Sequence, residues 1–223
     1  MSHCNSQSFT STPTARLLWR NSAPMFGAIL ALFAYDLLES SLLALQSEAI
    51  LTAFGFTLPI TAAMTALAIG LSIHANNKTV HCNCVDQRML SQVVSNTLFS
   101  NTVVVLVFSI LFFLFNDQLL FTTGNMQWLQ GLSADNYANS QNSYMSMRYL
   151  GWVFMALFWQ ANAILRALGW MKYASTLMFS WALMKAFLAV LVLTPQSPMF
   201  SSDLAALGIV HLCTDMFFAF ISL

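Results

Sequence analysis

Charge is the property that this sequence has least of. Only 7% of its 223 residues are charged, 58% are hydrophobic, and the formal net charge is zero. A water-soluble domain carries roughly 25% charged residues to keep its surface wetted, so this composition excludes an ordinary soluble fold. The balanced charge also gives no reason to expect a nucleic-acid partner. The solvent of this chain is therefore a lipid bilayer.

Short motifs that mark common enzymes are also missing. The sequence contains no glycine-rich phosphate loop with its lysine and no serine elbow with a partnered histidine, so neither ATP hydrolysis nor acyl transfer is predicted. We expect the chain not to be an enzyme and to hold no resident cofactor. If it moves solutes, a gradient of Na⁺ or H⁺ drives the movement.

Cysteine is scarce and scattered, which excludes a disulfide framework. Cys4 lies near the N-terminus, Cys82 and Cys84 lie in one polar connection, and Cys213 lies in a late apolar segment. The Cys82-x-Cys84 pair is closer than the usual zinc-binding spacing and has no second pair, so no metal site is predicted.

Six long apolar segments are present, each sufficient to cross about 30 Å of hydrocarbon as a helix of around 20 residues. In lipid every backbone polar group needs an internal partner, and uninterrupted apolar runs fit helices rather than the strands of a barrel. The sequence predicts an all-α, polytopic membrane protein, with a polar cytoplasmic tail at residues 1–21 and about six transmembrane helices within residues 22–223. A short interfacial helix is also predicted around residues 125–132. The six predicted spans are residues 22–46, 49–74, 90–115, 145–166, 173–194 and 203–223.

The distribution of Lys and Arg predicts the orientation. Basic residues are retained in the cytoplasm, and nearly all of them lie on one side when the predicted spans are threaded through a bilayer. We therefore expect a multi-pass protein of the inner (plasma) membrane with both termini in the cytoplasm. Arg148 is the exception on the outer side, and the basic residues on the inner side are Arg16, Arg20, Lys78, Arg88, Arg166 and Lys172.

Ionisable residues inside the apolar segments are the candidate functional residues, since a charge at mid-bilayer costs about 2.5–3.5 kcal/mol. Asp36, in the first segment, is predicted to bind or exchange the coupling cation or proton, with Lys185 as its ion-pair partner. Glu39, one turn after Asp36, either shares that role or lies near the outer third, where water reaches it. His211 and Asp215 share a helix face and are a candidate proton relay, unless Asp215 is interfacial.

Three further residues in the apolar segments are unusual there. Gln160 and Asn162 either line a substrate cavity or hydrogen-bond a neighbouring helix, which is the commoner role of such residues. Pro59 removes a backbone hydrogen bond in the second segment and predicts a kink.

Several short motifs occur in an order and spacing that resembles the N-terminal lobe of the multidrug and toxic compound extrusion (MATE) family. The resemblance covers roughly residues 17–215. The motifs are Pro24 followed by Asp36, Gly55 and Pro59 in LTAFGFTLPI, Gly70-Leu71-Ser72, Tyr144 with Arg148 and Gly151, and Arg166 with Gly169 in ILRALGWMK.

This resemblance implies half of a twelve-helix, two-lobe transporter that exports small amphipathic compounds by cation- or proton-coupled antiport, with Asp36 handling the coupling ion. Lys185 and Ala189 depart from the family pattern, which has an asparagine and an acid at these places. The second lobe is expected from a homodimer or from a separately encoded partner, unless the product is truncated. Two alternatives remain open, namely a flippase for lipid-linked sugars of the same superfamily and a non-transporting membrane subunit or inactive remnant.

Overall fold

The structure is a computed structural model that describes residues 14–85, 87–123, 134–194 and 204–223. All regular structure in these ranges is helical, which confirms the predicted all-α fold class. The predicted interfacial helix at residues 125–132 lies outside the described residues. The helices are α1 (Thr14–Gln46), α2 (Glu48–Val85), α3 (Gln87–Leu114), α4 (Asn116–Thr122), α6 (Ala134–Ala167), α7 (Met171–Leu193) and α8 (Leu204–Ser222).

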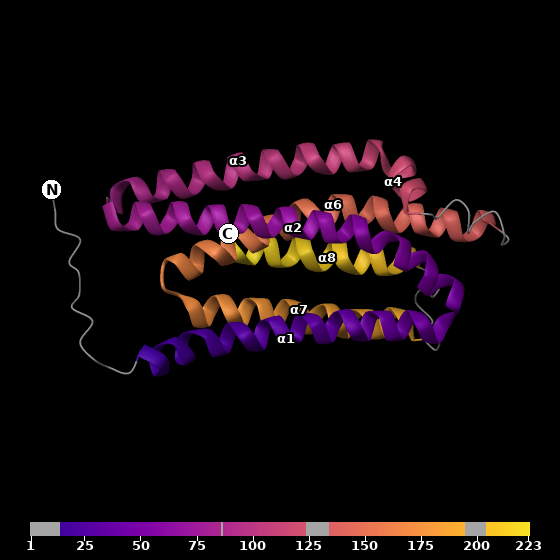
Figure 1. The fold of residues 1–223 in the computed structure, drawn as a ribbon, viewed down its shortest axis with the longest axis horizontal. Coiled ribbons are helices and arrows are strands. Elements are labelled where there is room, and N and C mark those ends of the chain that lie inside the picture. Colours follow the sequence, from indigo (N-terminus) through magenta and orange to yellow (C-terminus); the bar gives the residue numbers. More distant parts are fainter. Residues whose placement is uncertain (1–13, 86, 124–133, 195–203) are drawn as a thin grey trace.

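Six long helices run side by side, and the short α4 lies at one end of the bundle (Figure 1). Five of them, α1, α2, α3, α7 and α8, contain segments long and apolar enough to cross a membrane. The sixth, α6, has 34 residues and places Gln160 and Asn162 within its apolar stretch, where neighbouring helices bury both. The start of α1 and the end of α8 lie at the same end of the bundle, as an even number of crossings requires (Figure 1).

Three helix boundaries differ clearly from the predicted ones, and one of them is the start of α6 at Ala134, where the prediction had residue 145. The first helix begins at Thr14, inside the predicted tail of residues 1–21. The second continues to Val85, so that the predicted polar connection after residue 75 is largely helical. A helix of 38 residues is about 57 Å long at 1.5 Å per residue, so α2 extends well beyond about 30 Å of hydrocarbon. Apolarity marks the part of a helix that lies in lipid, and the helix itself continues into water.

Helices α2 and α6 run parallel and are joined by a ladder of side-chain hydrogen bonds to backbone carbonyls. The rungs follow one another at intervals of about three helical turns, so the same faces of the two helices stay in contact along their length. The rungs are Gln141 Nε2 to the Ala53 carbonyl (3.0 Å), Trp152 Nε1 to the Met64 carbonyl (3.0 Å) and Asn76 Nδ2 to the Ala163 carbonyl (3.1 Å).

Glycines allow α6 and α8 to approach closely. A Cβ atom at Gly208 would lie 3.1 Å from the Cβ of Met147 and 3.2 Å from the Cα of Tyr144. On the opposite helix, a Cβ at Gly151 would lie 3.3 Å from the Cα of Leu212. Small residues at such crossings bring the backbones together, which holds the charged side chains of both helices at short range.

Helix α2 bends in its N-terminal part, the part that contains Pro59 (Figure 1). Proline has no N–H to donate to the carbonyl four residues earlier, which weakens the helix at that point. The Thr57 hydroxyl donates to the carbonyl of Phe54 at 2.7 Å, and such bonds also favour bending.

Candidate ion-coupling site

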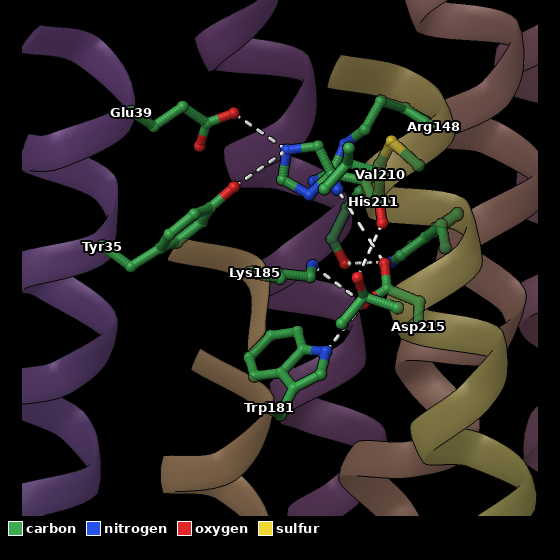
Figure 2. A network of polar contacts seen from close by, with 11 residues as sticks. Tyr35, Glu39, Arg148, Trp181, Lys185, Val210, His211 and Asp215 are labelled. Atoms are coloured by element: carbon green, nitrogen blue, oxygen red, sulfur yellow. Dashed lines mark hydrogen bonds and ion pairs between the residues drawn. The ribbon is translucent and has the colours of Figure 1, made fainter. Parts of the chain in front are cut away.

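Ionisable side chains from four helices meet in the middle of the apolar bundle. They come from α1, α6, α7 and α8, and most of them are almost fully buried (Figure 2). The exposed fraction is 4% for Glu39, 2% for Lys185, 4% for His211 and 0% for Asp215. Charged residues are rarely buried to this degree unless they are paired, so the pairing decides what the cluster can do.

One half of the cluster joins α1 to α8. The Nε2 atom of His211 lies 2.8 Å from Glu39 Oε1 and 3.2 Å from the hydroxyl of Tyr35, as Figure 2 shows. The second ring nitrogen, Nδ1, is buried and has no hydrogen-bond partner among the described residues. A proton on Nδ1 would therefore be unsatisfied, which favours the neutral tautomer with its proton on Nε2, donating to the Glu39 carboxylate.

The other half joins α7 and α6 to α8 through Asp215. Lys185 Nζ lies 2.8 Å from Asp215 Oδ1, and the indole N–H of Trp181 donates to the same oxygen at 2.9 Å. The Lys185 ammonium also lies 4.2 Å from the centroid of the Trp181 ring, within the range of a cation–π contact. Arg148 Nη1 approaches Asp215 Oδ2 at 4.0 Å. Asp215 is thus held as a carboxylate by two cations and one neutral donor.

The predicted pair of Lys185 with Asp36 is wrong. Asp36 is exposed at the surface of the lobe, on the turn of α1 before Glu39, whereas the ammonium of Lys185 is buried against Asp215. A buried ammonium gains most from an equally buried carboxylate, because the attraction between them is little screened there.

The same geometry bears on two further residues. Glu39 and Asp215 are both buried among the helices, so neither side chain is exposed at the surface of the lobe. Their depth in the bilayer stays a prediction. His211 and Asp215 do share one face of α8, but they take different partners, Glu39 and Lys185 respectively. A relay along α8 between these two residues therefore has no support in their contacts.

The two polar residues of α6 have different surroundings. Asn162 Nδ2 donates to the Ala174 carbonyl of α7 at 2.7 Å, so it links two helices. Gln160 is fully buried, and neither of its side-chain polar atoms has a hydrogen-bond partner among the described residues. The contacts therefore favour helix linkage for Asn162 and leave the cavity role open for Gln160.

Three residues of the cluster were not predicted as site residues, namely Tyr35, Arg148 and Trp181. A sequence signal for them exists, because on each contributing helix an aromatic residue precedes a charged one by four positions. That spacing places both on one helix face. The four pairs are Tyr35 with Glu39, Tyr144 with Arg148, Trp181 with Lys185, and His211 with Asp215.

Comparison with solved structures identifies the architecture. A multidrug resistance MATE family transporter of the MOP superfamily, solved in an outward-facing conformation, is similar to the chain with a TM-score of 0.75 at 16% sequence identity. The chain has the fold of one MATE lobe. This lobe is also similar, with a TM-score of 0.67 at 14% identity, to a MOP superfamily transporter from Pyrococcus furiosus. The binding pocket of that transporter is described as having a reverse polarity that suggests a different function.

Both matches cover 92% of the lobe and 43% of the other chain, so the lobe spans less than half of either transporter. The resemblance inferred from the sequence motifs is confirmed at the level of the fold. No family profile matches the sequence, and no curated protein is significantly similar to it.

Proposed function

We propose that this chain forms one lobe of a two-lobe secondary transporter in the plasma membrane, with both termini cytoplasmic. It exports small amphipathic compounds in exchange for the coupling ion, which enters the cell. The second lobe comes from a second copy or from a partner chain. The observation that carries the proposal is a cluster of buried, mutually paired charges at the centre of a bundle with a MATE-lobe fold. Ionisable residues in the membrane interior are costly and mark ion pathways and proton sites.

Asp36 and Glu39 have different surroundings, which suit them to different roles in ion coupling. Asp36 is exposed on the lobe, and in this proposal it faces a water-filled cavity between two lobes, whereas Glu39 is buried. Parallel lobes of such transporters are related by an axis along the membrane normal, which allows a second copy in the same orientation to complete the assembly.

A flippase for lipid-linked sugars is the second candidate, because two cations, the partly buried Arg148 and the buried Lys185, could face a pyrophosphate. We favour the exporter, since the ammonium of Lys185 is already paired with Asp215 at 2.8 Å and Arg148 lies near the same carboxylate. An anion would have to displace Asp215 from both cations.

The test is proton-driven ethidium efflux from cells that express the full chain. We expect Asp36→Asn to lose most of the efflux. Asp117→Asn makes the same chemical change at an exposed residue of α4, outside the cluster, and is expected to leave the efflux unchanged. Efflux that survives Asp36→Asn removes the coupling role of this residue. Absence of efflux from a chain that crosslinks as a dimer favours a non-transporting subunit, and movement of a lipid-linked sugar in place of ethidium favours the flippase.

A further inference from the structure

Two cations flank the turn between α6 and α7, and neither forms an ion pair with an acid among the described residues. Arg166 is half-buried in the last turn of α6, and Lys172 is exposed in the first turn of α7. The Nε–H of Arg166 donates to the Asn162 carbonyl of its own helix at 3.3 Å, and Nη1 lies 3.4 Å from the sulfur of Met25 on α1. A thioether is a weak acceptor, so most of the hydrogen-bonding capacity of this guanidinium is unused in the described part of the lobe.

The backbone of this turn is fixed by two hydrogen bonds. The N–H of Trp170 donates to the Leu165 carbonyl at 2.9 Å, and the N–H of Gly169 donates to the Arg166 carbonyl at 3.0 Å. The two bonds form a Schellman motif, and Gly169 takes the positive φ of 87° that this motif requires. Helix α7 begins directly after Trp170 without a side-chain cap, so its first N–H groups point out of the helix at the same place. The turn therefore holds Arg166 close to the positive end of the α7 dipole.

Two aromatic residues lie beside these cations in the chain. Trp170 in the turn is 62% exposed and Tyr173 is 48% exposed, and their rings meet edge to face with centroids 6.3 Å apart. Exposed Trp and Tyr side chains are enriched at the level of lipid headgroups, because they have an apolar ring and a polar group that needs water or a headgroup. The α6–α7 turn therefore has the composition of a membrane–water interface.

The exposed face of α7 runs from polar to apolar, as a phospholipid does. Lys172 is followed on one helix face by Thr176 and then by Phe179, Leu183 and Phe187, at intervals of three or four residues, and all five are exposed. The helix thus presents a cation at its end and a continuous apolar surface below it. This order matches a charged headgroup with acyl chains attached to it.

The end of the bundle that contains this turn is positive. Helix α1 begins and α2 ends there, whereas α4 lies at the other end (Figure 1). The charged side chains described at this end are all cations, namely Lys78, Arg166 and Lys172. The described carboxylates lie in the middle of the bundle or at the other end, and they are Asp36, Glu39, Asp215, Glu48 and Asp117. An anion at the α6–α7 turn is therefore attracted by its surroundings and not repelled.

We propose that the α6–α7 turn binds the phosphate headgroup of an anionic phospholipid, with Arg166 and Lys172 as its cationic partners. A guanidinium holds two phosphate oxygens at once, and the ammonium adds a further charge-assisted bond. The acyl chains lie along Phe179, Leu183 and Phe187 of α7. Inorganic phosphate offers the same oxygens but gains nothing from this apolar face, so the lipid is the ligand that the site fits. Only the leaflet depends on the proposed orientation, in which this end is cytoplasmic.

The experiment is native mass spectrometry of the purified full chain in a neutral detergent, with added palmitoyl-oleoyl phosphatidylglycerol or phosphatidylcholine of the same acyl chains. We expect the anionic lipid to bind the wild type more tightly than the zwitterionic one. Arg166→Gln and Lys172→Gln should each weaken binding of the anionic lipid about fivefold, the effect of one basic residue near an anionic lipid. Lys78→Gln makes the same change at an exposed cation of α2, at the same end of the bundle, and should leave binding unchanged. Lys172→Arg keeps the charge and should keep the affinity.

Equal binding of the two lipids overturns the proposal, and so does full binding when both cations are replaced. A loss in Lys78→Gln as large as that in Lys172→Gln also overturns it, because the cations would then act only through the general charge of this end. Inorganic phosphate that binds alone and displaces the lipid identifies the free anion as the ligand. If Arg166→Gln does not fold, Lys172→Gln decides. The measurement needs neither substrate nor second lobe, so absence of lipid binding contradicts this inference alone, and absence of efflux contradicts the transport function alone.

Discussion

Lys185 and Asp215, on neighbouring helices, form an ion pair with 2.8 Å between Nζ and Oδ1 and almost no exposure of either side chain. Trp181 contacts both partners, by a hydrogen bond to the carboxylate and by its ring to the ammonium. The pair therefore holds α7 against α8, and its two charges neutralise each other.

Removing one partner of this pair should strongly destabilise the lobe. Asp215→Asn leaves the ammonium of Lys185 buried without its counter-charge, and we expect the free energy of unfolding to fall by about 3–5 kcal/mol. Replacing both residues, as Lys185→Met with Asp215→Leu, should recover most of this loss. Unfolding by SDS titration in mixed micelles measures the difference. A double variant no more stable than Asp215→Asn would show that the pair is not the origin of the loss.

The close crossing of α6 and α8 predicts intolerance to side chains at Gly208. We expect Gly208→Val to reduce the free energy of unfolding by about 1–3 kcal/mol, because its side chain would overlap Met147 and Tyr144. Gly70→Ala is the matched control, since nothing lies within 4 Å of a Cβ at that position and alanine favours a helix. Equal stability of Gly208→Val and the wild type in the same titration would contradict the described crossing.

Gln160 and Asn162 should respond in opposite ways to replacement by leucine. Gln160 has no hydrogen-bond partner in the described part of the chain, so Gln160→Leu removes a buried unsatisfied amide and should stabilise the lobe by about 1–3 kcal/mol. Asn162→Leu removes the bond to the Ala174 carbonyl and should destabilise it. If Gln160→Leu also abolishes ethidium efflux while raising stability, Gln160 contacts the substrate. A loss of stability in Gln160→Leu would mean that its amide has a partner after all.

Ethidium efflux that is coupled to protons should not depend on sodium. We expect ethidium efflux to depend on an external pH below the internal pH, because protons then enter through the site as substrate leaves. Efflux should stop when the external pH is raised to the internal value and should continue when choline replaces Na⁺. Fluorescence of ethidium in proteoliposomes with imposed gradients measures both. Efflux driven by a Na⁺ gradient at equal pH would identify the other ion.

The helical architecture was predictable because lipid imposes a simple rule on the sequence. Each apolar segment had to be a helix, and the number of long helices followed from the number of such segments. Helix ends were less predictable. Helix α2 continues to Val85 through polar residues, and no proline interrupts the helix there. The polar composition of residues 76–85 predicted that this segment lies in water, and contact with water does not by itself end a helix.

Most of the ionisable residues of the site were predictable, and their pairing was not. Asp36, Glu39, Lys185, His211 and Asp215 are conspicuous because each is costly in lipid. Which carboxylate meets Lys185 depends on the rotation of α1 and α8 about their axes, and the apolar patterns on both helices leave that rotation undetermined. Arg148 was assigned to the outer side by its position near a helix start, and that position alone gave no sign that its guanidinium approaches Asp215 at 4.0 Å.

The contact between Glu39 and His211 joins residues that are 172 positions apart in the chain. During synthesis, α1 therefore enters the bilayer long before its partner on the last helix exists. Until α8 is inserted, Glu39 lacks the histidine that contacts it in the assembled structure. The insertion of α8 thus completes the surroundings of a side chain that entered the bilayer several helices earlier.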